Sequence, residues 1–498
     1  MSNDTKTALL ICGDWNHSMA LADWSINENV ELHVVPDLCH KSRRISRLLT
    51  GKGISRLVLG LCSEDYSMVD IQTQARNMEL DVLGVEIIPI QGVGLEKAKI
   101  LLTAAVAKAR TYTGSKPENA KPYFSTRVSR RSLFKLSALE YRSVPSIQEV
   151  RCAADLGCKA CVKVCPNGAL EWSGGKVYYD KTKCEACGLC VTACPRGAII
   201  NPIFTPAQLE AQISTLLDPT IGDITPRGIL FTCQRAAELE RSCHESWMPV
   251  KLPCVGMAPS SWLLAPLLMG ASAVNVFPCG RRCSVGQTQT IARKVAYCQK
   301  FLRLIGASED LVKLSQSLDQ PPSESGKKLF LENPFSHKAT ASVLMRIAQE
   351  YDAGEVVLEH PSSPFGIVEV RSDVCTGCGI CAKTCPTGAL LHDVGDEDMT
   401  LTFDAAMCVA CGQCLLKCPE ADQGAISLSS RTDLGRIGQG RIPIYREDTL
   451  QCIACSDPIA PVQMIKRIEK LLGSEYTTAT SILTRYCPTC RGTMAFHG

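Results

Sequence analysis

The sequence lacks the segments that send proteins to or across membranes. Its N-terminus carries no basic leader, and the first apolar run is too short for a signal peptide. The most apolar stretch, residues 261–277, is interrupted by Pro266, Gly270 and Asn275, which makes it a poor membrane span. We therefore expect a cytoplasmic protein with no direct membrane span, in which residues 261–277 form a buried helix followed by a buried strand.

Most patterns of enzymatic sites are also missing. We find no Ser–His–Asp or carboxylate constellation, no phosphate-binding loop, and no molybdenum or nickel signature. No segment follows the strand–GxGxxG–helix pattern of dinucleotide binding, since the glycines in residues 91–96 are too short a match. These absences favour a protein without substrate chemistry of its own.

What the sequence does contain is cysteine, at 29 of its 498 residues. The chain is too long for a small disulfide-stapled domain, and most of its cysteines lie in C-x2-C and C-x3-C-P runs, which suit metal ligation in a reducing compartment. The formal charge is +3. Four or five clusters of about −2 each would bring the loaded protein to about −5 to −7. We therefore expect no nucleic-acid partner.

Residues 367–430 contain two copies of the run C-x2-C-x2-C-x3-C-P. This is the pattern of bacterial ferredoxins with two 4Fe–4S clusters, in which the fourth cysteine ligates the other cluster. The first cluster should be held by Cys375, Cys378, Cys381 and Cys418. The second should be held by Cys408, Cys411, Cys414 and Cys385.

Residues 145–202 repeat this module with one irregularity. One complete ligand set consists of Cys184, Cys187, Cys190 and Cys165. The other set has Cys158, Cys161 and Cys194, with Asp155 where the first cysteine is expected. Cys152 can complete it through a longer loop, and a thiolate suits iron better than a carboxylate does. Ligation by Asp155 and a degraded or three-iron cluster are the alternatives.

Residues 1–115 and 203–310 follow a different pattern, in which short apolar runs ending on cysteine alternate with helical patterns such as residues 94–110. This alternation predicts parallel sheets, whose ligands gather at the carboxyl ends of the strands. The cysteines of the first segment are Cys12, Cys39 and Cys62. Three thiolates leave a four-ligand set incomplete. His17 and His40 are candidates for the missing ligand, unless they are surface histidines and the site holds no cluster.

In residues 203–310 the cysteines that end or follow strands are Cys233, Cys254 and Cys279, and Cys283 lies close by. Four thiolates at one sheet edge suit a 2Fe–2S cluster, whereas the alternative is buried structural cysteine. Cys298, in the middle of a helical pattern, fits that alternative. Cys243 is a spare thiol in a predicted loop.

The last 59 positions, residues 440–498, contain two C-x2-C pairs, Cys452 with Cys455 and Cys487 with Cys490. Two such pairs are typical of a tetrahedral structural zinc site. Iron, in a rubredoxin-like or iron–sulfur site, is the alternative. Polar, proline-containing residues 116–144 are predicted to be a linker, and residues 311–366 a linker with a helix.

The stretch from Cys233 to about residue 307 resembles the delta subunit of methyl-viologen-reducing hydrogenase. The resemblance lies in the cysteines at strand ends, in GASAVNVFPCGRRC (270–283) and in the helix ending CQKFLRLIGAS (298–308). It implies a 2Fe–2S cluster that passes electrons to heterodisulfide reductase, with four cysteines inheriting the ligand roles: Cys233, Cys254, Cys279 and Cys283. The family usually has a second cysteine soon after the first, and its last pair is spaced differently, which leaves Cys243 as an alternative ligand.

Residues 1–115 are similar to the start of the heterodisulfide reductase A subunit, through LLICG (9–13), VVPDLC (34–39) and RLVLGLCS (56–63). The flavin domain that follows in that subunit is absent here, so we expect no bound flavin.

The predicted fold class is α/β plus α+β and multidomain. It comprises two small parallel-sheet α/β domains, two ferredoxin-like modules with two 4Fe–4S clusters each, and a C-terminal four-cysteine knuckle. The predicted function is an electron-transfer subunit that connects a redox enzyme (a hydrogenase, formate dehydrogenase or flavoprotein) with a partner or ferredoxin. The first alternative is a catalytic component of a heterodisulfide-reductase-like complex, acting on a thiol or disulfide at an incompletely ligated cluster. The second is a redox sensor or assembly scaffold.

Overall fold

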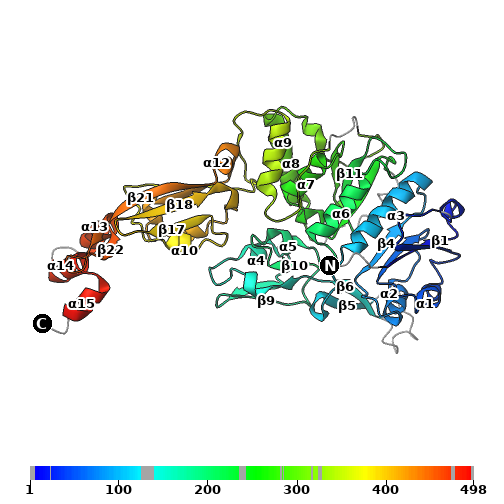
Figure 1. Ribbon diagram of the computed structural model, residues 1–498, viewed down its shortest axis with the longest axis horizontal. Helices are drawn as coiled ribbons and strands as arrows, with labels where there is room; N and C mark the ends of the chain where they lie inside the picture. Colours follow the sequence, from blue (N-terminus) through cyan, green and yellow to red (C-terminus); the bar gives the residue numbers. More distant parts are fainter. Residues whose placement is uncertain are drawn as a thin grey trace. The chain divides into compact units, whose positions relative to one another are not determined.

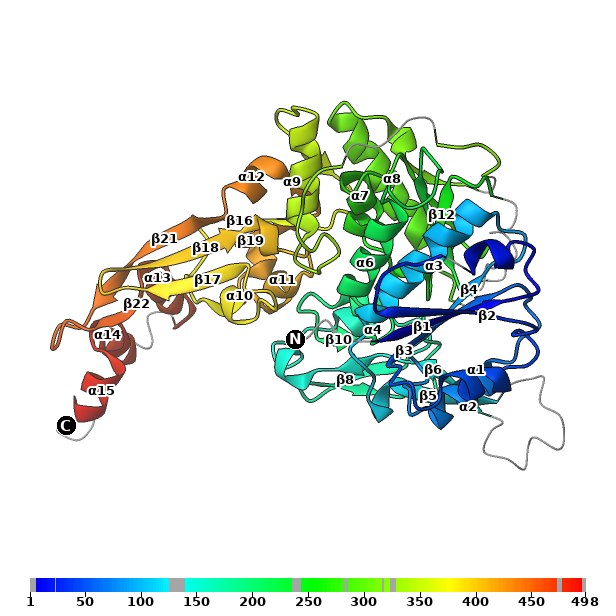
Figure 2. The same ribbon diagram turned by 45° about the vertical axis from the view of Figure 1, so that its right-hand side comes forward.

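The computed structural model is shown in Figures 1 and 2. It describes residues 6–22, 24–124, 139–234, 243–280, 283, 285–315, 318–322, 328–472 and 477–494. These residues form two compact units. The first contains Met1–Arg151, Cys161–Glu171 and Tyr178–Asp352, and the second contains Cys152–Ala160, Trp172–Val177 and Ala353–Gly498. Among the described residues, no helix is long and apolar enough to cross a membrane.

The first unit begins with a parallel sheet of order β2-β1-β3-β4, formed by β1 (Thr7–Cys12), β2 (Val30–Val35), β3 (Arg56–Leu61) and β4 (Val85–Pro89). Helices α1 (Arg43–Leu49) and α2 (Met68–Asn77) pack on one face, and α3 (Leu95–Arg110) covers the other. Every residue of β1 is buried, as expected for a central strand covered on both faces.

A second sheet in the same unit repeats this arrangement with order β12-β11-β13-β14, and all its pairs are parallel. Its strands are β11 (Gly228–Cys233), β12 (Trp247–Leu252), β13 (Val274–Phe277) and β14 (Val312–Leu314). Its helices are α6 (Pro206–Leu216), α7 (Ser260–Leu268), α8 (Thr288–Leu304) and α9 (Thr340–Glu350). The prediction for residues 261–277 is confirmed, because buried α7 is followed by β13. Both views show α6 beside α3 (Figures 1 and 2).

Residues 116–144, predicted to be a linker, carry an antiparallel pair of strands, β5 (Ala120–Phe124) and β6 (Leu139–Ser143). The Gln72 side chain on α2 binds this pair by two 2.8 Å hydrogen bonds, to the carbonyl oxygen and from the N–H of Tyr141. The described part of the predicted linker is thus packed structure, while residues 125–138 of that prediction lie outside the described residues.

Short elements surround the cysteines of the first ferredoxin-like module. Strand β7 (Ser146–Ile147) pairs with β10 (Ile199–Ile200), and β8 (Leu170–Ser173) pairs with β9 (Lys176–Tyr179). The two helices are α4 (Ala160–Val164) and α5 (Leu189–Ala193).

The second unit contains the other module and the C-terminal segment. Strand β15 (Val357–Glu359) pairs with β20 (Arg431–Asp433), and β16 (Ile367–Val370) pairs with β19 (Ile426–Ser429). A four-stranded sheet joins β17 (Leu390–Val394), β18 (Asp398–Asp404), β21 (Arg441–Gln451) and β22 (Pro458–Pro461). The helices are α10 (Ile380–Lys383), α11 (Gln413–Lys417), α12 (Leu434–Gly438), α13 (Val462–Leu472), α14 (Thr477–Arg485) and α15 (Pro488–Met494). Because β21 pairs with β18, the predicted tail of residues 440–498 begins inside the sheet of the preceding module.

Candidate metal centres

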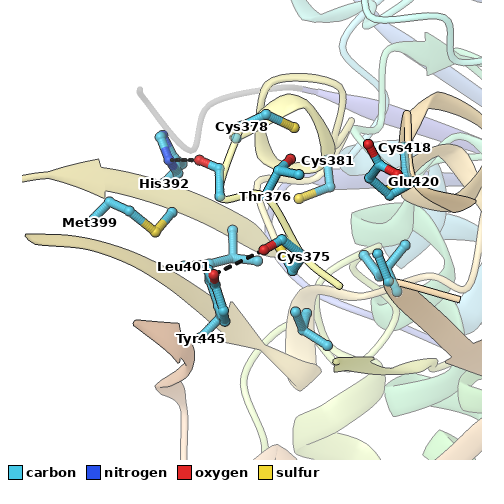
Figure 3. A pocket seen from close by; sticks show the side chains of 15 residues that line it. Cys375, Thr376, Cys378, Cys381, His392, Met399, Leu401, Cys418, Glu420 and Tyr445 are labelled. Atoms are coloured by element: carbon cyan, nitrogen blue, oxygen red, sulfur yellow. Dashed lines mark hydrogen bonds between the residues drawn. The ribbon is translucent and has the colours of Figure 1, made fainter. Parts of the chain in front are cut away.

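One predicted cluster site of the second module is visible as a small cavity (Figure 3). Its walls contain all four cysteines of one predicted set, Cys375, Cys378, Cys381 and Cys418. The remaining wall is largely apolar and includes Met399 and Leu401. Four soft thiolate ligands around one apolar cavity fit a 4Fe–4S cluster.

The backbone around this cavity is shaped by glycine. Gly377 and Gly379 have φ of +64° and +70°, in the left-handed region. A Cβ on Gly379 would lie 2.6 Å from Nδ1 of His392, whose Nε2 is 3.0 Å from the carbonyl oxygen of Gly377. The Tyr445 hydroxyl lies 3.0 Å from the carbonyl oxygen of Cys375. These contacts fix the loop that carries three of the cysteines.

The second set of this module consists of Cys408, Cys411, Cys414 and Cys385. Burial raises the pKa of Cys408 to about 12 and that of Cys414 to about 11. The charges of the neighbouring thiols, including Cys385 and Cys411, contribute to both of these shifts. Thiols that crowd together in this way become stable thiolates when metal ions bind them.

In the first module, burial raises the pKa of Cys190 well above its ordinary value, and the charges of Cys187, Cys184, Cys161 and Cys165 act in the same direction. The complete set predicted from the sequence is therefore gathered in one place. Backbone N–H groups already face two of its sulfur atoms at 3.3 Å, that of Ala186 at Cys184 and that of Ala169 at Cys165. Such N–H···S bonds are a means of tuning an iron–sulfur cluster.

The irregular loop before Cys158 is a tight turn. The Cys158 N–H donates to the carbonyl oxygen of Ala153 at 3.2 Å, and Gly157 turns the chain with φ of +86°. Asp155 is exposed at this turn, whereas Cys152 is partly buried. The assignment of Cys152 as the fourth ligand stays a prediction.

In the second parallel sheet, four cysteines line one cavity of about 570 Å³. Thiol hydrogen bonds connect Cys254 to Cys233, Cys233 to Cys279, and Cys279 to Cys283. The bond from Cys254 lowers the pKa of Cys233 to about 6. Cys187 of the first module lines the same cavity.

The two other cysteines of this domain lie elsewhere. Cys243 lines a different cavity of about 410 Å³, and the Lys97 Nζ is 3.8 Å from its sulfur. Cys298 is fully buried in α8, and its thiol lies 3.7 Å from the Ser260 carbonyl oxygen. The structure therefore groups Cys283, rather than Cys243, with the three strand-end cysteines.

The sequence patterns did not point to Lys294, which lies on α8 near Cys254. Its Nζ donates to the carbonyl oxygens of Gly256, at 2.7 Å, and Ala258, at 2.9 Å. Burial lowers the pKa of Lys294 to about 8. Nothing in the spacing of residues connects a lysine to a turn that precedes it by 36–38 positions.

Comparison with known protein families gives three matches. Residues 151–198 and 374–423 each match a 4Fe-4S dicluster domain. Residues 230–324 match the methyl-viologen-reducing hydrogenase delta subunit. The chain thus contains two dicluster domains and a hydrogenase delta-subunit domain, which confirms the resemblance seen in the sequence. No curated protein matches the chain. The similarity of residues 1–115 to heterodisulfide reductase A stays a prediction.

Two further cysteine groups lie outside the matched segments. In the first, the sulfur atoms of Cys12, Cys39 and Cys62 all lie within 4.8 Å of one another. Cys62 also lines a cavity of about 370 Å³ that includes His17. The His40 Nδ1 instead lies 3.0 Å from an oxygen of Asp37, so only His17 of the two candidate histidines borders this cavity.

The second group is at the C-terminus, where the sulfur atoms of Cys452, Cys455, Cys487 and Cys490 also lie within 4.8 Å of one another. The Cys455 sulfur is 3.6 Å from that of Cys487 and 3.5 Å from that of Cys490. A tetrahedral zinc ion with Zn–S bonds of about 2.3 Å requires S···S distances of about 3.8 Å. The compact arrangement favours one ion over a cluster, because cluster ligands bind different iron atoms and spread apart.

Proposed function

We propose that the protein is a multi-cluster electron-transfer subunit. It connects a redox enzyme, such as a hydrogenase, formate dehydrogenase or flavoprotein, with a partner protein or ferredoxin. The observation that carries this proposal is the cavity of about 570 Å³ whose wall contains Cys187 and the four cysteines of the delta-subunit domain. Ligands of two predicted clusters in one wall favour a relay over isolated structural sites.

The proposed loading is four 4Fe–4S clusters and one 2Fe–2S cluster. Two cubanes occupy each dicluster domain, with the ligand sets given by the sequence, including Cys152 for the irregular site. The 2Fe–2S cluster is held by Cys233, Cys254, Cys279 and Cys283. The C-terminal cysteines hold a structural zinc ion. These clusters supply one-electron oxidation and reduction, and the chain's own residues hold and insulate them.

The test is metal analysis of the purified protein together with EPR of its reduced form. We expect about 18 iron atoms per chain, because four cubanes contain sixteen and a 2Fe–2S cluster contains two. We also expect one zinc and no flavin. Iron below about eight atoms would leave too few cubanes for a relay. Rapid turnover of a disulfide by the isolated chain would also contradict the relay.

The alternative function, action on a thiol or disulfide substrate as part of a heterodisulfide-reductase-like complex, is favoured by the three-cysteine site. Cys12, Cys39 and Cys62 supply three thiolates, and the adjacent cavity gives a small molecule room beside Cys62. A metal centre there would have an open position, as catalytic metal sites do. Replacing Cys62 with serine separates the two functions: electron transfer between the first dicluster domain and the delta-subunit domain should persist, whereas disulfide reduction should stop.

A further inference from the structure

We propose that the turn η6 (Val255–Met257) is the bridge through which electrons pass between the first dicluster domain and the delta-subunit domain. It joins the cubane of Cys184, Cys187, Cys190 and Cys165 to the cluster that begins at Cys233. The inference rests on the proposed relay and adds a route and its positioning residues.

The turn directly contacts residues that are predicted to hold the cluster of the delta-subunit domain. It follows the predicted ligand Cys254 in the chain, and the Val255 N–H lies 3.4 Å from the sulfur of Cys233. Gly256 leaves no space for a side chain, since a Cβ there would lie 2.6 Å from the Cβ of Gln287 and 3.4 Å from the Cys254 sulfur. The turn therefore contacts two predicted ligands of this cluster.

Its other end packs against the loop that carries the predicted cubane ligand Cys187 and the following Gly188, here called the cubane loop. Met257 is fully buried, and its sulfur would lie 2.8 Å from a Cβ on Gly188, the residue after Cys187. Gly188 has φ of +76°, so both the backbone conformation and the space at this position require glycine. The methionine side chain thus lies against the backbone next to a cubane ligand.

Hydrogen bonds hold the turn from both sides. The Thr192 hydroxyl on α5 donates to the carbonyl oxygen of Met257 at 2.5 Å. Lys294 on α8 binds the carbonyl oxygens on either side of it, those of Gly256 and Ala258. Three successive carbonyl groups are therefore fixed, two by the delta-subunit domain and one by the ferredoxin module.

This packing matters because electrons tunnel more readily through bonded and closely packed atoms than through a water-filled gap. The step itself is simple. One electron would leave the reduced cubane and be accepted by the 2Fe–2S cluster. No bond would form or break, and no proton would move. Gly188 and Thr192 act as positioning residues, because they set the contact between η6 and the cubane loop.

The test compares five variants of the full, metal-loaded chain, and the fifth, Thr192→Ser, tests rescue. Gly188→Ala should push Met257 away, and Thr192→Val should release its carbonyl group. Gly174→Ala is the matched control for the glycine, with φ of +55° and no atom within 4 Å of an added Cβ. Thr215→Val is the control for the threonine, because its hydroxyl bonds within its own helix.

The measurement is freeze-quench EPR after rapid partial reduction, which follows how fast the two clusters share electrons, together with their spin–spin interaction. We expect Gly188→Ala and Thr192→Val to slow this exchange several-fold and weaken the interaction, while both controls match the unaltered protein. Thr192→Ser, which keeps the hydroxyl, should restore the rate.

Equal rates in the bridge variants and the controls, with both clusters present, would overturn the bridge and leave the relay intact. Absence of the clusters from the unaltered protein would instead contradict the proposed function. If Gly188→Ala cannot be loaded, the Thr192→Val and Thr192→Ser pair decides, because unchanged exchange in Thr192→Val also overturns the bridge.

Discussion

At the scale of single residues, Lys294 is a cation placed to act on the delta-domain cluster. Among the described residues no carboxylate forms an ion pair with it, and its charge faces the thiol of Cys254. A nearby positive charge stabilises the more negative, reduced cluster. We therefore expect Lys294→Met to lower the reduction potential of this cluster by on the order of 50–100 mV. This shift corresponds to the loss of a charge–charge interaction of about 1–2 kcal/mol at an effective dielectric constant near 20.

An EPR-monitored redox titration measures this potential. The matched control is Lys300→Met, because Lys300 lies exposed on the same helix and its charge is screened by water. Lys294→Arg keeps the charge and should retain most of the potential. An equal potential in Lys294→Met and the control would show that Lys294 has no electrostatic role.

The irregular loop gives a second prediction at this scale. Cys152→Ser should remove about four iron atoms per chain, the content of one cubane. Asp155→Ala should leave the iron content unchanged, because the Asp155 side chain is exposed at the turn. Iron analysis of both variants decides, and loss of iron only in Asp155→Ala would reverse the ligand assignment.

The roles of individual residues at the sites could be predicted from the sequence to different degrees. The cysteine sets could be predicted because cluster ligands recur at fixed short spacings, which can be recognised in a short stretch of sequence. Lys294 and Thr192 could not, because each acts on a carbonyl group 36–65 positions away in the chain. Every residue has a backbone carbonyl group, so the sequence does not mark which one a side chain will bind. Only the fold brings these carbonyl groups to Lys294 and Thr192.

At the scale of elements, the two parallel sheets have the same strand order and carry cysteine at the ends of the corresponding three strands. Apolar runs that stop at a cysteine were enough to predict both. The pair β5–β6 was missed, because residues 116–144 are polar and contain prolines. Partners far along the chain, including Gln72, hold it, and sequence composition does not reveal such contacts.

This contact can be tested. Gln72→Ala removes both hydrogen bonds to Tyr141 and leaves two backbone groups without these partners, at a cost of about 1–3 kcal/mol. We expect faster amide hydrogen exchange in β5 and β6 and a lower melting temperature. Thr73→Ala is the control, because its hydroxyl bonds only within α2. Unchanged exchange in Gln72→Ala would mean that other contacts hold this strand pair.

At the scale of the whole molecule, we expect metal binding and folding to be coupled, and the C-terminal segment is where this can be argued. In the sequence, one cysteine pair of the four-cysteine site precedes strand β22 and helix α13, and the other pair follows them. Strand β21 runs from that site into the sheet of the dicluster domain. On α13, Arg467 lies 3.0 Å from Glu420, which lines the cluster cavity of Cys375. The tail thus supports one wall of a cluster site.

Zinc should contribute most of this support. A structural zinc site contributes about 10–16 kcal/mol to folding, whereas a partly exposed ion pair contributes about 1 kcal/mol or less. Cys487→Ser combined with Cys490→Ser should therefore abolish zinc binding and speed hydrogen exchange in α13–α15. Arg467→Ala should leave the zinc in place and cause a smaller change, confined to the surroundings of Glu420.

Elemental analysis and hydrogen exchange check this order of effects, with Cys243→Ser as the control because that thiol lies outside every proposed ligand set. Iron should stay near its full value in all these variants, since none of them removes a cluster ligand. Zinc retained in the double variant would contradict the site. Loss of one iron atom, with the visible absorption of a ferric tetrathiolate, would instead show that this site binds iron, because the same four thiolates suit either ion.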